Sequence, residues 1–247
     1  MNQIQMAPLT PVVKKLIIAM GAVWFVGQII LEKFLGVGLS QWFLLFPNKV
    51  VSDFWMWQTF TYMFFHALSP FHIFFNCLML WFIGGELEKH WGPRFFSIYL
   101  FTCGVGAALV YCIGVALYAV FSGNTGPLLI PVAGASGAIF GLLVAYGIIF
   151  SERTIYFMGL FPLKAKYFAM IAAALDLSSL LTTGFAGGEV AYLAHLGGAL
   201  VGFLFLWGHT RIKLLNTKSK VKKSTSLRLV VDNEKKDPKD PGPKYWN

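Results

Sequence analysis

Stretches of about 20 predominantly apolar residues recur along this chain of 247 residues, and they constrain its fold more than any other feature. A helix of that length crosses the ~30 Å hydrocarbon core of a bilayer. Charged residues make up 13% of the chain, whereas a soluble domain carries about 25%, and they lie mostly between the apolar stretches. Because backbone groups in lipid must be paired within the structure, stretches of helical length indicate a helix bundle. We therefore expect an all-α membrane protein.

The apolar stretches predict six transmembrane helices. The expected spans cover residues 16–31, about 67–87, about 95–121, about 133–150, about 167–181 and about 190–208. The first stretch has the length of a signal-peptide core, but no small-residue cleavage pattern follows it, so we expect it to be retained. The aromatic segment 36–58 is expected to lie in the membrane interface, and the Gly-rich segment 182–188 to form the fifth loop.

The chain divides by composition into two parts. Residues 1–210 hold all six expected spans and are predicted to form one transmembrane domain. From residue 211 onward the sequence turns basic and then rich in Pro, Lys and Asp. Such a segment cannot bury enough apolar surface to fold, so we expect residues 211–247 to be a disordered tail.

The basic residues predict the orientation in the membrane. With the N-terminus inside, the inner segments contain Lys14, Lys15, Lys89, Arg94, Arg153, Lys164, Lys166 and the whole tail. The outer loops contain only Lys33 and Lys49. This asymmetry predicts that both termini are cytoplasmic. The net charge of +9 has the same explanation, since eleven of the twenty Lys and Arg residues follow Trp207, and no nucleic-acid partner is expected.

Four polar residues inside the expected spans are candidates for function, because polar groups in a bilayer are costly. They are His72 and Asn76 in the second span, Ser136 in the fourth and His195 in the sixth. Taken singly, each is better explained by ordinary helix packing than by a functional role. At 1.5 Å per residue, however, three of them lie roughly 24–26 Å above the inner charged boundary, since His72 is 17 residues before Lys89, Ser136 is 17 before Arg153 and His195 is 16 before Arg211. Three parallel helices thus present one hydroxyl and two imidazoles in one layer, with Asn76 one turn below His72.

Small residues flank the candidate serine and histidine. Ala133, Gly137 and Gly141 form a stripe beside Ser136, and a second stripe of Ala194, Gly198 and Gly202 runs beside His195. Such stripes allow helices to approach closely. Close approach is needed for a serine on one helix to donate a hydrogen bond to a histidine on another.

Three segments together resemble the signature regions of rhomboid proteases. They read HALSPFHIFFNCLMLWFIGGELEKHWG at 66–92, GASG at 134–137 and AHLGG at 194–198. Gly84, Glu88 and Gly92 also follow the family's G-x-x-x-E-x-x-x-G pattern. The resemblance covers about residues 14–210, in the order and spacing of the family, and implies a six-helix fold.

The resemblance implies an intramembrane serine endopeptidase. Ser136 corresponds to its nucleophile and His195 to its general base and acid, and His72 and Asn76 to the oxyanion hole. The family uses a Ser–His dyad, and no acidic third member is expected. Asp176 in the fifth span lies roughly 15 Å above the inner boundary at Lys166, against ~25 Å for the dyad, and is therefore predicted to lie in the wrong layer.

One residue departs from the family pattern near the dyad. Phe140 stands one turn after Ser136, where many members have a tyrosine that packs on the catalytic histidine. The resemblance predicts that the aromatic face is kept and that the hydroxyl is lost.

The implied partners are transmembrane protein substrates and the lipid bilayer, and no cofactor or metal is expected. By resemblance, substrate enters near the fifth span. Two alternatives remain: an inactive rhomboid-like protein that binds clients without cleaving them, and a small transporter. The first usually lacks the serine or the histidine, and the second would show paired repeats or interrupted helices. The six-span layout favours a bacterial inner membrane.

Overall fold

The computed structural model describes residues 9–157, 161–183 and 192–224. The long apolar helical segments, in chain order, are α1 (Pro11–Ala22) with η1 (Val23–Phe34), α5 (Pro70–Met79) with η3 (Leu80–Gly84) and α6 (Gly85–Trp91), α7 (Pro93–Ser122), α8 (Ser136–Ile149), α9 (Ala165–Thr183) and α10 (Tyr192–Ser224). The shorter elements are α2 (Ser40–Phe43), α3 (Pro47–Asp53), α4 (Gln58–Thr61), η2 (Tyr62–Phe64), η4 (Gly126–Leu129), β1 (Thr154–Phe157) and β2 (Phe161–Lys164). The predicted all-α membrane bundle is confirmed.

Five helices in the described residues are long and apolar enough to cross a membrane, and α8 is a shorter apolar helix of 14 residues. The first and second spans are continuous helices that change to π-helical geometry along their length, at η1 and η3. The helices α5, η3 and α6 together run from Pro70 to Trp91 as one span.

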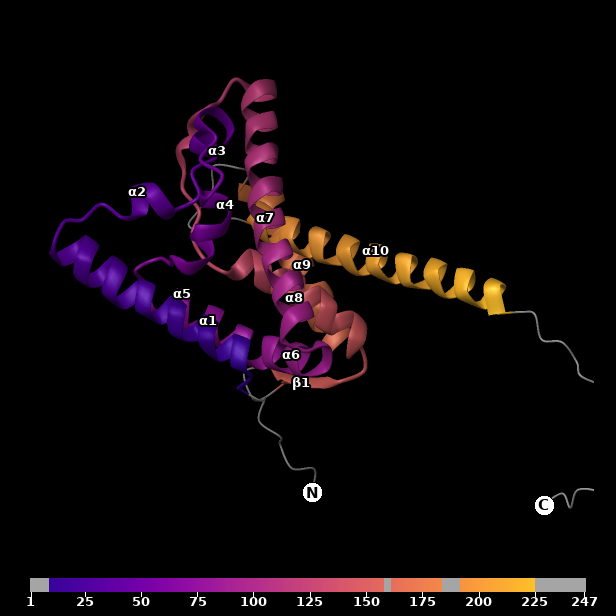
Figure 1. The fold of residues 1–247 in the computed structure, drawn as a ribbon. Helices are drawn as coiled ribbons and strands as arrows, with labels where there is room; N and C mark the ends of the chain where they lie inside the picture. The colour runs from indigo at the N-terminus through magenta and orange to yellow at the C-terminus, as the bar shows by residue number, and fades with distance from the viewer. Residues whose placement is uncertain (1–8, 158–160, 184–191, 225–247) are drawn as a thin grey trace, which may run out of the picture. The chain divides into compact units, whose positions relative to one another are not determined.

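Helix α7 lies at the centre of the bundle and packs against α8, α6, α3 and α4. Its buried face includes Phe96, Tyr99 and Cys103. Tyr99 donates its hydroxyl to the carbonyl of Gly141 on α8 at 2.8 Å, which satisfies a polar group inside the bundle. In Figure 1, α3 lies near one end of α7, and α6 and β1 lie near the other.

A buried carboxylate joins the first and second spans. Glu88 on α6 accepts hydrogen bonds from the backbone N–H groups of Val12 and Val13, at 3.0 and 2.9 Å, and from the Thr10 hydroxyl. The first N–H groups of a helix have no partner within it, and the positive end of the helix dipole favours a negative charge there. Glu88, the glutamate of the G-x-x-x-E-x-x-x-G pattern, therefore caps α1 from a distant part of the chain.

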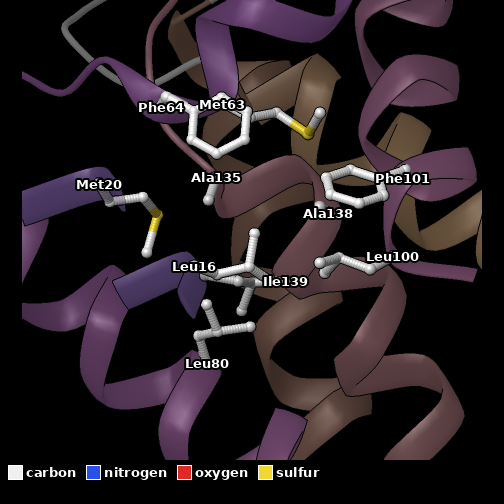
Figure 2. Close-up of a pocket in the computed structure, with 10 residues that line it drawn as sticks. All are labelled: Leu16, Met20, Met63, Phe64, Leu80, Leu100, Phe101, Ala135, Ala138 and Ile139. Carbon is white, nitrogen blue, oxygen red and sulfur yellow. The ribbon is translucent and has the colours of Figure 1, made fainter. Parts of the chain in front are cut away.

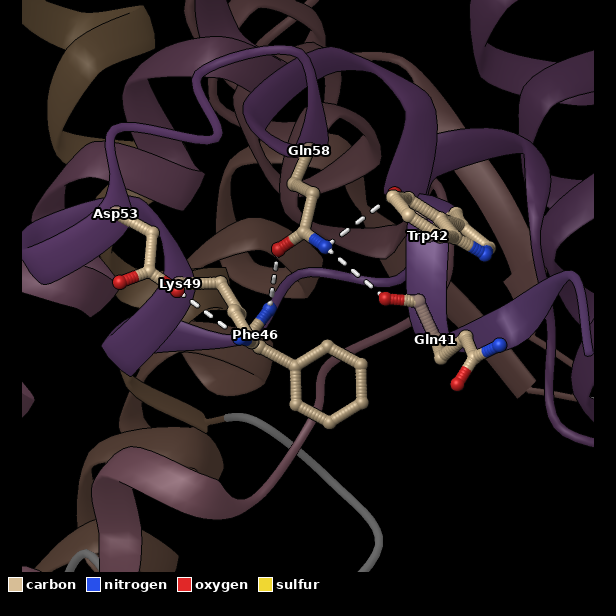
Figure 3. Close-up of polar contacts among 6 residues, drawn as sticks. All are labelled: Gln41, Trp42, Phe46, Lys49, Asp53 and Gln58. Atoms are coloured by element: carbon tan, nitrogen blue, oxygen red, sulfur yellow. Dashed lines mark hydrogen bonds and ion pairs between the residues drawn. The ribbon is translucent and has the colours of Figure 1, made fainter.

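The loop between η1 and α4 contains the two short helices α2 and α3 and is held together by a buried amide (Figure 3). The Gln58 side chain accepts from the backbone N–H of Phe46 at 3.0 Å and donates toward the carbonyls of Gln41 and Trp42 at 3.5 and 3.3 Å. On its exposed side Trp42 stacks on Trp55. The aromatic surface fits the predicted position in the interface.

The fourth span begins later than the sequence predicts. The segment 130–135 before α8 is not helical, and its backbone pairs with other parts of the chain. Val132 and Leu45 exchange N–H and carbonyl groups at 2.9 and 3.0 Å, and the Gly134 N–H donates to the carbonyl of Tyr62 at 3.0 Å. Non-helical backbone at membrane depth is stable only when it is paired in this way inside the protein. As a result, α8 starts at Ser136 itself.

An antiparallel hairpin of β1 and β2, which the sequence analysis does not predict, connects α8 to α9. Glu152 before β1 pairs with Lys164 at 2.6 Å and with Lys166. The hydrogen bond from Lys164 is the main cause, with that from Lys166, of a fall in the pKa of Glu152 to about 2. Arg153 forms an ion pair with Glu86 of α6 at 2.5 Å, which fixes the base of the hairpin to the second span.

The last helix continues beyond its predicted end, since α10 runs to Ser224. The chain separates into two units, Met1–Gly208 and His209–Asn247, near the predicted boundary at 210. Residues 225–247 of the expected disordered tail lie outside the described residues, as do residues 184–188 of the expected fifth loop. The division into a domain and a tail stays a prediction.

Candidate active site

Ser136 is the first residue of α8 and lies against His195 of α10. Its Oγ is 2.7 Å from Nε2 of the His195 imidazole. Because α8 starts here, the N–H groups of its first turn lack carbonyl partners within the helix and carry the positive end of its dipole. The hydroxyl therefore lies both within hydrogen-bond reach of a base and at a helix terminus that favours negative charge.

Asp176 of α9 contacts the other nitrogen of the same imidazole. Its Oδ2 is 2.6 Å from Nδ1 of His195. The expectation that Asp176 lies in a different layer is therefore wrong. The depth of Ser136 was counted down to Arg153 along one straight helix, but α8 ends at Ile149. Ile149 lies thirteen residues after Ser136, which gives Ser136 a depth of about 20 Å, against about 15 Å for Asp176. The side chains of Ser136 and Asp176, which both reach the His195 ring, span the remaining difference in depth.

The two contacts of the His195 ring define its tautomer. A neutral imidazole donates from one nitrogen and accepts at the other. An ionised carboxylate can only accept, so Nδ1 carries the hydrogen and donates it to Asp176. Nε2 is then free to accept the proton of the Ser136 hydroxyl.

Phe140 covers the face of the His195 ring. The two rings are stacked, with centroids 4.5 Å apart and planes inclined by 11°. The expected aromatic contact is thus present, and phenylalanine supplies no hydroxyl to it. The stack sets the plane of the imidazole but not its rotation within that plane.

The two predicted stripes of small residues meet where α8 crosses α10. A Cβ added to Gly198 would lie 1.9 Å from the carbonyl oxygen of Gly137, and one added to Gly202 would lie 2.9 Å from Cα of Gly141. The backbones are therefore in direct contact, between Gly137, which follows Ser136 directly, and Gly198, which lies about one turn beyond His195. This close approach places the two side chains within hydrogen-bonding distance.

His72 of α5 lies on the other side of Gly134. Its Nδ1 accepts the backbone N–H of Ala67 at 3.0 Å, so in the neutral ring the hydrogen is on Nε2. A Cβ on Gly134 would meet Nε2 of His72 at 3.1 Å and Oγ of Ser136 at 3.7 Å. The donor nitrogen of His72 and the serine hydroxyl thus border the same glycine, which has a φ of +118°.

Asn76 lies one turn below His72 and bonds to its own helix. Its Nδ2 donates to the carbonyl of His72 at 2.8 Å, which uses one of the two N–H donors of the amide. Its buried Oδ1 has no hydrogen-bond partner among the described residues. The structure thus places Asn76 on the helix face that carries His72, without a described contact to Ser136.

The segment before α5 is held by the first span, through a residue that the sequence analysis did not select. The Gln28 amide of η1 exchanges two hydrogen bonds with the backbone of His66, at 2.7 and 2.9 Å, and Trp24 donates to the carbonyl of Ala67 at 3.1 Å. This anchors the N–H group that orients His72. Gln28 could have been found by the same criterion as the others, because it is a polar residue within an apolar stretch.

His66 lies beside His72 as a buried, uncharged neighbour. Burial, reinforced by the nearby His72, lowers the pKa of His66 to about 4. The two rings meet at an angle with centroids 5.3 Å apart. A neutral His66 adds no positive charge beside His72.

A small pocket borders the site on the side of α1 and α7 (Figure 2). All of its lining residues are apolar, and two of them, Ala135 and Ala138, lie one and two residues from Ser136 in the sequence. With no polar group to orient a ligand, the pocket is a gap in helix packing. Across the described ranges, no group of three or more His, Cys, Asp or Glu side chains could hold a metal ion.

The chain is similar to a known family of membrane proteins. The model of the Rhomboid domain family matches residues 53–212, more than half of the chain. The chain belongs to the rhomboid family. Rhomboid protein 1, mitochondrial, of Saccharomyces cerevisiae is 29% identical over 139 residues, which are 55% of this chain and 37% of that protein. The match thus spans little more than a third of the length of this relative.

The rhomboid match includes every candidate residue described above except those of the first span. Ser136, His195, His72 and Asn76 all lie within residues 53–212, and so does Asp176. Helix α1 and η1 precede the matched region, and they supply Gln28 and the end that Glu88 caps. This rhomboid is an integral, multi-pass membrane protein.

Proposed function

We propose that this rhomboid is a serine endopeptidase that hydrolyses peptide bonds in or near transmembrane segments of membrane proteins. The observation that carries the proposal is the 2.7 Å contact between Oγ of Ser136 and Nε2 of His195. A serine hydroxyl is a weak nucleophile unless a base lies within such a distance. Both groups lie on apolar helices, which suits a substrate that is itself in the bilayer.

The chemistry proceeds in two stages. Nε2 of His195 takes the hydroxyl proton as Ser136 Oγ attacks the scissile carbonyl, and the resulting imidazolium gives that proton to the leaving amine. This leaves an acyl-enzyme on Ser136. Water then attacks the ester, with its proton passing to His195 and back to Ser136 Oγ, which releases the new carboxyl terminus.

The oxyanion of each tetrahedral intermediate needs hydrogen-bond donors. We assign this role to the Nε2–H of His72, to the backbone N–H of Ser136 at the start of α8, and to the second N–H of Asn76. The accepted Ala67 N–H at Nδ1 of His72 supports the assignment, since it leaves the hydrogen on Nε2. Donors fixed in a site of low dielectric stabilise the developing charge without reorganisation.

The same proposal includes the orientation and partners of the protein. Both termini are cytoplasmic, substrates are transmembrane proteins, and the membrane is a bacterial inner membrane. The distribution of basic residues supports the orientation, with Lys164 and Lys166 at the hairpin end of the bundle.

Covalent labelling of the purified protein tests the proposal. A fluorophosphonate probe should modify Ser136 of the wild type, as located by mass spectrometry of the digested protein. Ser136→Ala and His195→Ala should remain unlabelled while eluting as folded protein in detergent. An unlabelled wild type, or label on a different serine, would instead favour a rhomboid that binds clients without cleaving them.

The oxyanion assignment makes a kinetic prediction. His72→Ala and Asn76→Ala should lower kcat with little change in KM, because these donors act mainly in the transition state. Loss of one such donor costs roughly 10²–10³ in kcat in a well-studied soluble protease. If KM rises in either variant while kcat is unchanged, that residue binds substrate and does not stabilise the oxyanion.

A further inference from the structure

Asp176 of α9 and Nδ1 of His195 are 2.6 Å apart, on the side of the ring opposite to Ser136. We propose that Asp176 is a positioning residue that orients His195 and turns the Ser–His pair into a Ser–His–Asp triad. This deepens the proposed function and rests on it. The family resemblance implies a dyad alone, so the third member is a property of this chain.

The surroundings of Asp176 favour a specific role. It is the one acidic residue of α9, a helix that otherwise presents mainly apolar side chains to the bilayer. The side chains of Asp176 and His195 are only 14% and 12% exposed. A carboxylate in a transmembrane helix is costly unless it is paired, and such residues usually face the protein interior and have a functional role. The partner of Asp176 is the ring that contacts the candidate nucleophile.

Phe140 and Asp176 constrain His195 in complementary ways. The stacked phenyl ring sets the imidazole plane and, lacking a hydroxyl, leaves the ring free to rotate within it. A carboxylate at Nδ1 removes that freedom and excludes the tautomer in which Nε2 carries the hydrogen. Only the remaining tautomer can accept the Ser136 proton.

The carboxylate also affects the charged state of the base. When Ser136 passes its proton to Nε2, His195 becomes an imidazolium, and a negative charge at Nδ1 stabilises it without itself taking the proton. In soluble triads, replacing this aspartate by asparagine keeps the geometry and lowers kcat by about 10⁴, because the amide favours the wrong tautomer.

Three variants of Asp176 and one control test the proposal. Asp176→Asn keeps the size and removes the charge, Asp176→Ala removes the contact, and Asp176→Glu keeps the carboxylate. Ser178→Asn, at an exposed position of the same helix, is the control for placing an amide on α9. For each purified protein, kcat and KM are measured with a transmembrane substrate, and the rate of Ser136 labelling is measured with a fluorophosphonate.

The two measurements separate positioning from other roles. Labelling requires an aligned base but no transmembrane substrate. We expect Asp176→Asn and Asp176→Ala to lower kcat and the labelling rate by the same factor, about 10²-fold or more, with KM unchanged. Asp176→Glu should recover at least tenfold of that loss, and Ser178→Asn should match the wild type.

Two results would overturn the proposal while leaving the proposed function intact. One is a labelling rate and kcat of Asp176→Asn within about twofold of the wild type, which would mean that Phe140 alone orients His195. The other is a raised KM with unchanged labelling, which would assign Asp176 to substrate entry. A wild-type protein that neither labels nor cleaves would refute the proposed function, and the triad with it.

Discussion

At the scale of residues, Gly134 connects two halves of the candidate site. His72 reaches it from α5, and Ser136 follows it by two residues in the chain. Its φ of +118° lies in a region that other residues rarely adopt, and its missing side chain leaves room for the His72 ring. The first glycine of the GASG segment is therefore required both for its backbone conformation and for the space that it leaves to the His72 ring.

Gly134→Ala should displace His72 and disable the site. The new Cβ would lie 3.0 Å from Cε1 and 3.1 Å from Nε2 of that ring, in addition to a backbone strain of about 1–3 kcal/mol. We expect kcat/KM for a transmembrane substrate to fall at least tenfold. Gly123→Ala is the matched control, because Gly123 also has a positive φ, of +72°, but open space around it. Equal activity losses in the two variants would mean that strain alone is responsible.

The four candidate residues were accessible from the sequence because they are polar residues within three apolar spans, three of them at a similar depth and Asn76 one turn below His72. The same criterion failed for Asp176, because the depth of Ser136 was measured from Arg153, which lies beyond the end of α8. It was not applied to Gln28, which lies alone in the first span and acts on the site through the backbone of His66. Depth counting finds residues in one layer but not the neighbours that orient them.

At the scale of elements, the existence of the spans was predictable and their ends were not. Apolar length indicates a helix, whereas the start of α8 at Ser136 depends on pairing of the preceding segment with Leu45 and Tyr62. The β1–β2 hairpin has strands of four residues, too short for an alternation pattern to be recognised. The π-helical segments η1 and η3 likewise have no distinct composition.

The contact between α8 and α10 makes a prediction about helix packing. Gly198→Ala would place a methyl group 1.9 Å from the Gly137 carbonyl, where only backbone movement can relieve the clash. We expect a destabilisation of about 1–3 kcal/mol or more, seen as a lower Tm in detergent, together with loss of cleavage. Gly208→Ala, on the same helix in open space, should retain both. Normal activity of the Gly198→Ala protein would contradict this prediction, because it would show that cleavage does not depend on the close approach of α8 and α10.

At the scale of the whole molecule, the order of motifs along the chain was the strongest information in the sequence. The second, fourth and sixth spans carry the polar residues, and all three pack against α7. The Glu88 cap attaches the first span to the second. The family match begins at residue 53, after the first span. The fifth span contributes Asp176 to the site, and the sequence did not predict this contribution.

Cleavage in a lipid bilayer shows whether Ser136 and His195 hydrolyse a peptide bond of a transmembrane substrate. Purified protein is reconstituted in vesicles with a substrate that has a single transmembrane segment, and the products are identified by mass spectrometry. We predict that the wild type cuts one bond in or near that segment, and that Ser136→Ala and His195→Ala, reconstituted in equal amounts, leave the substrate intact. Cleavage by both variants at more than a few per cent of the wild-type rate would contradict the assignment of Ser136 and His195 as nucleophile and base.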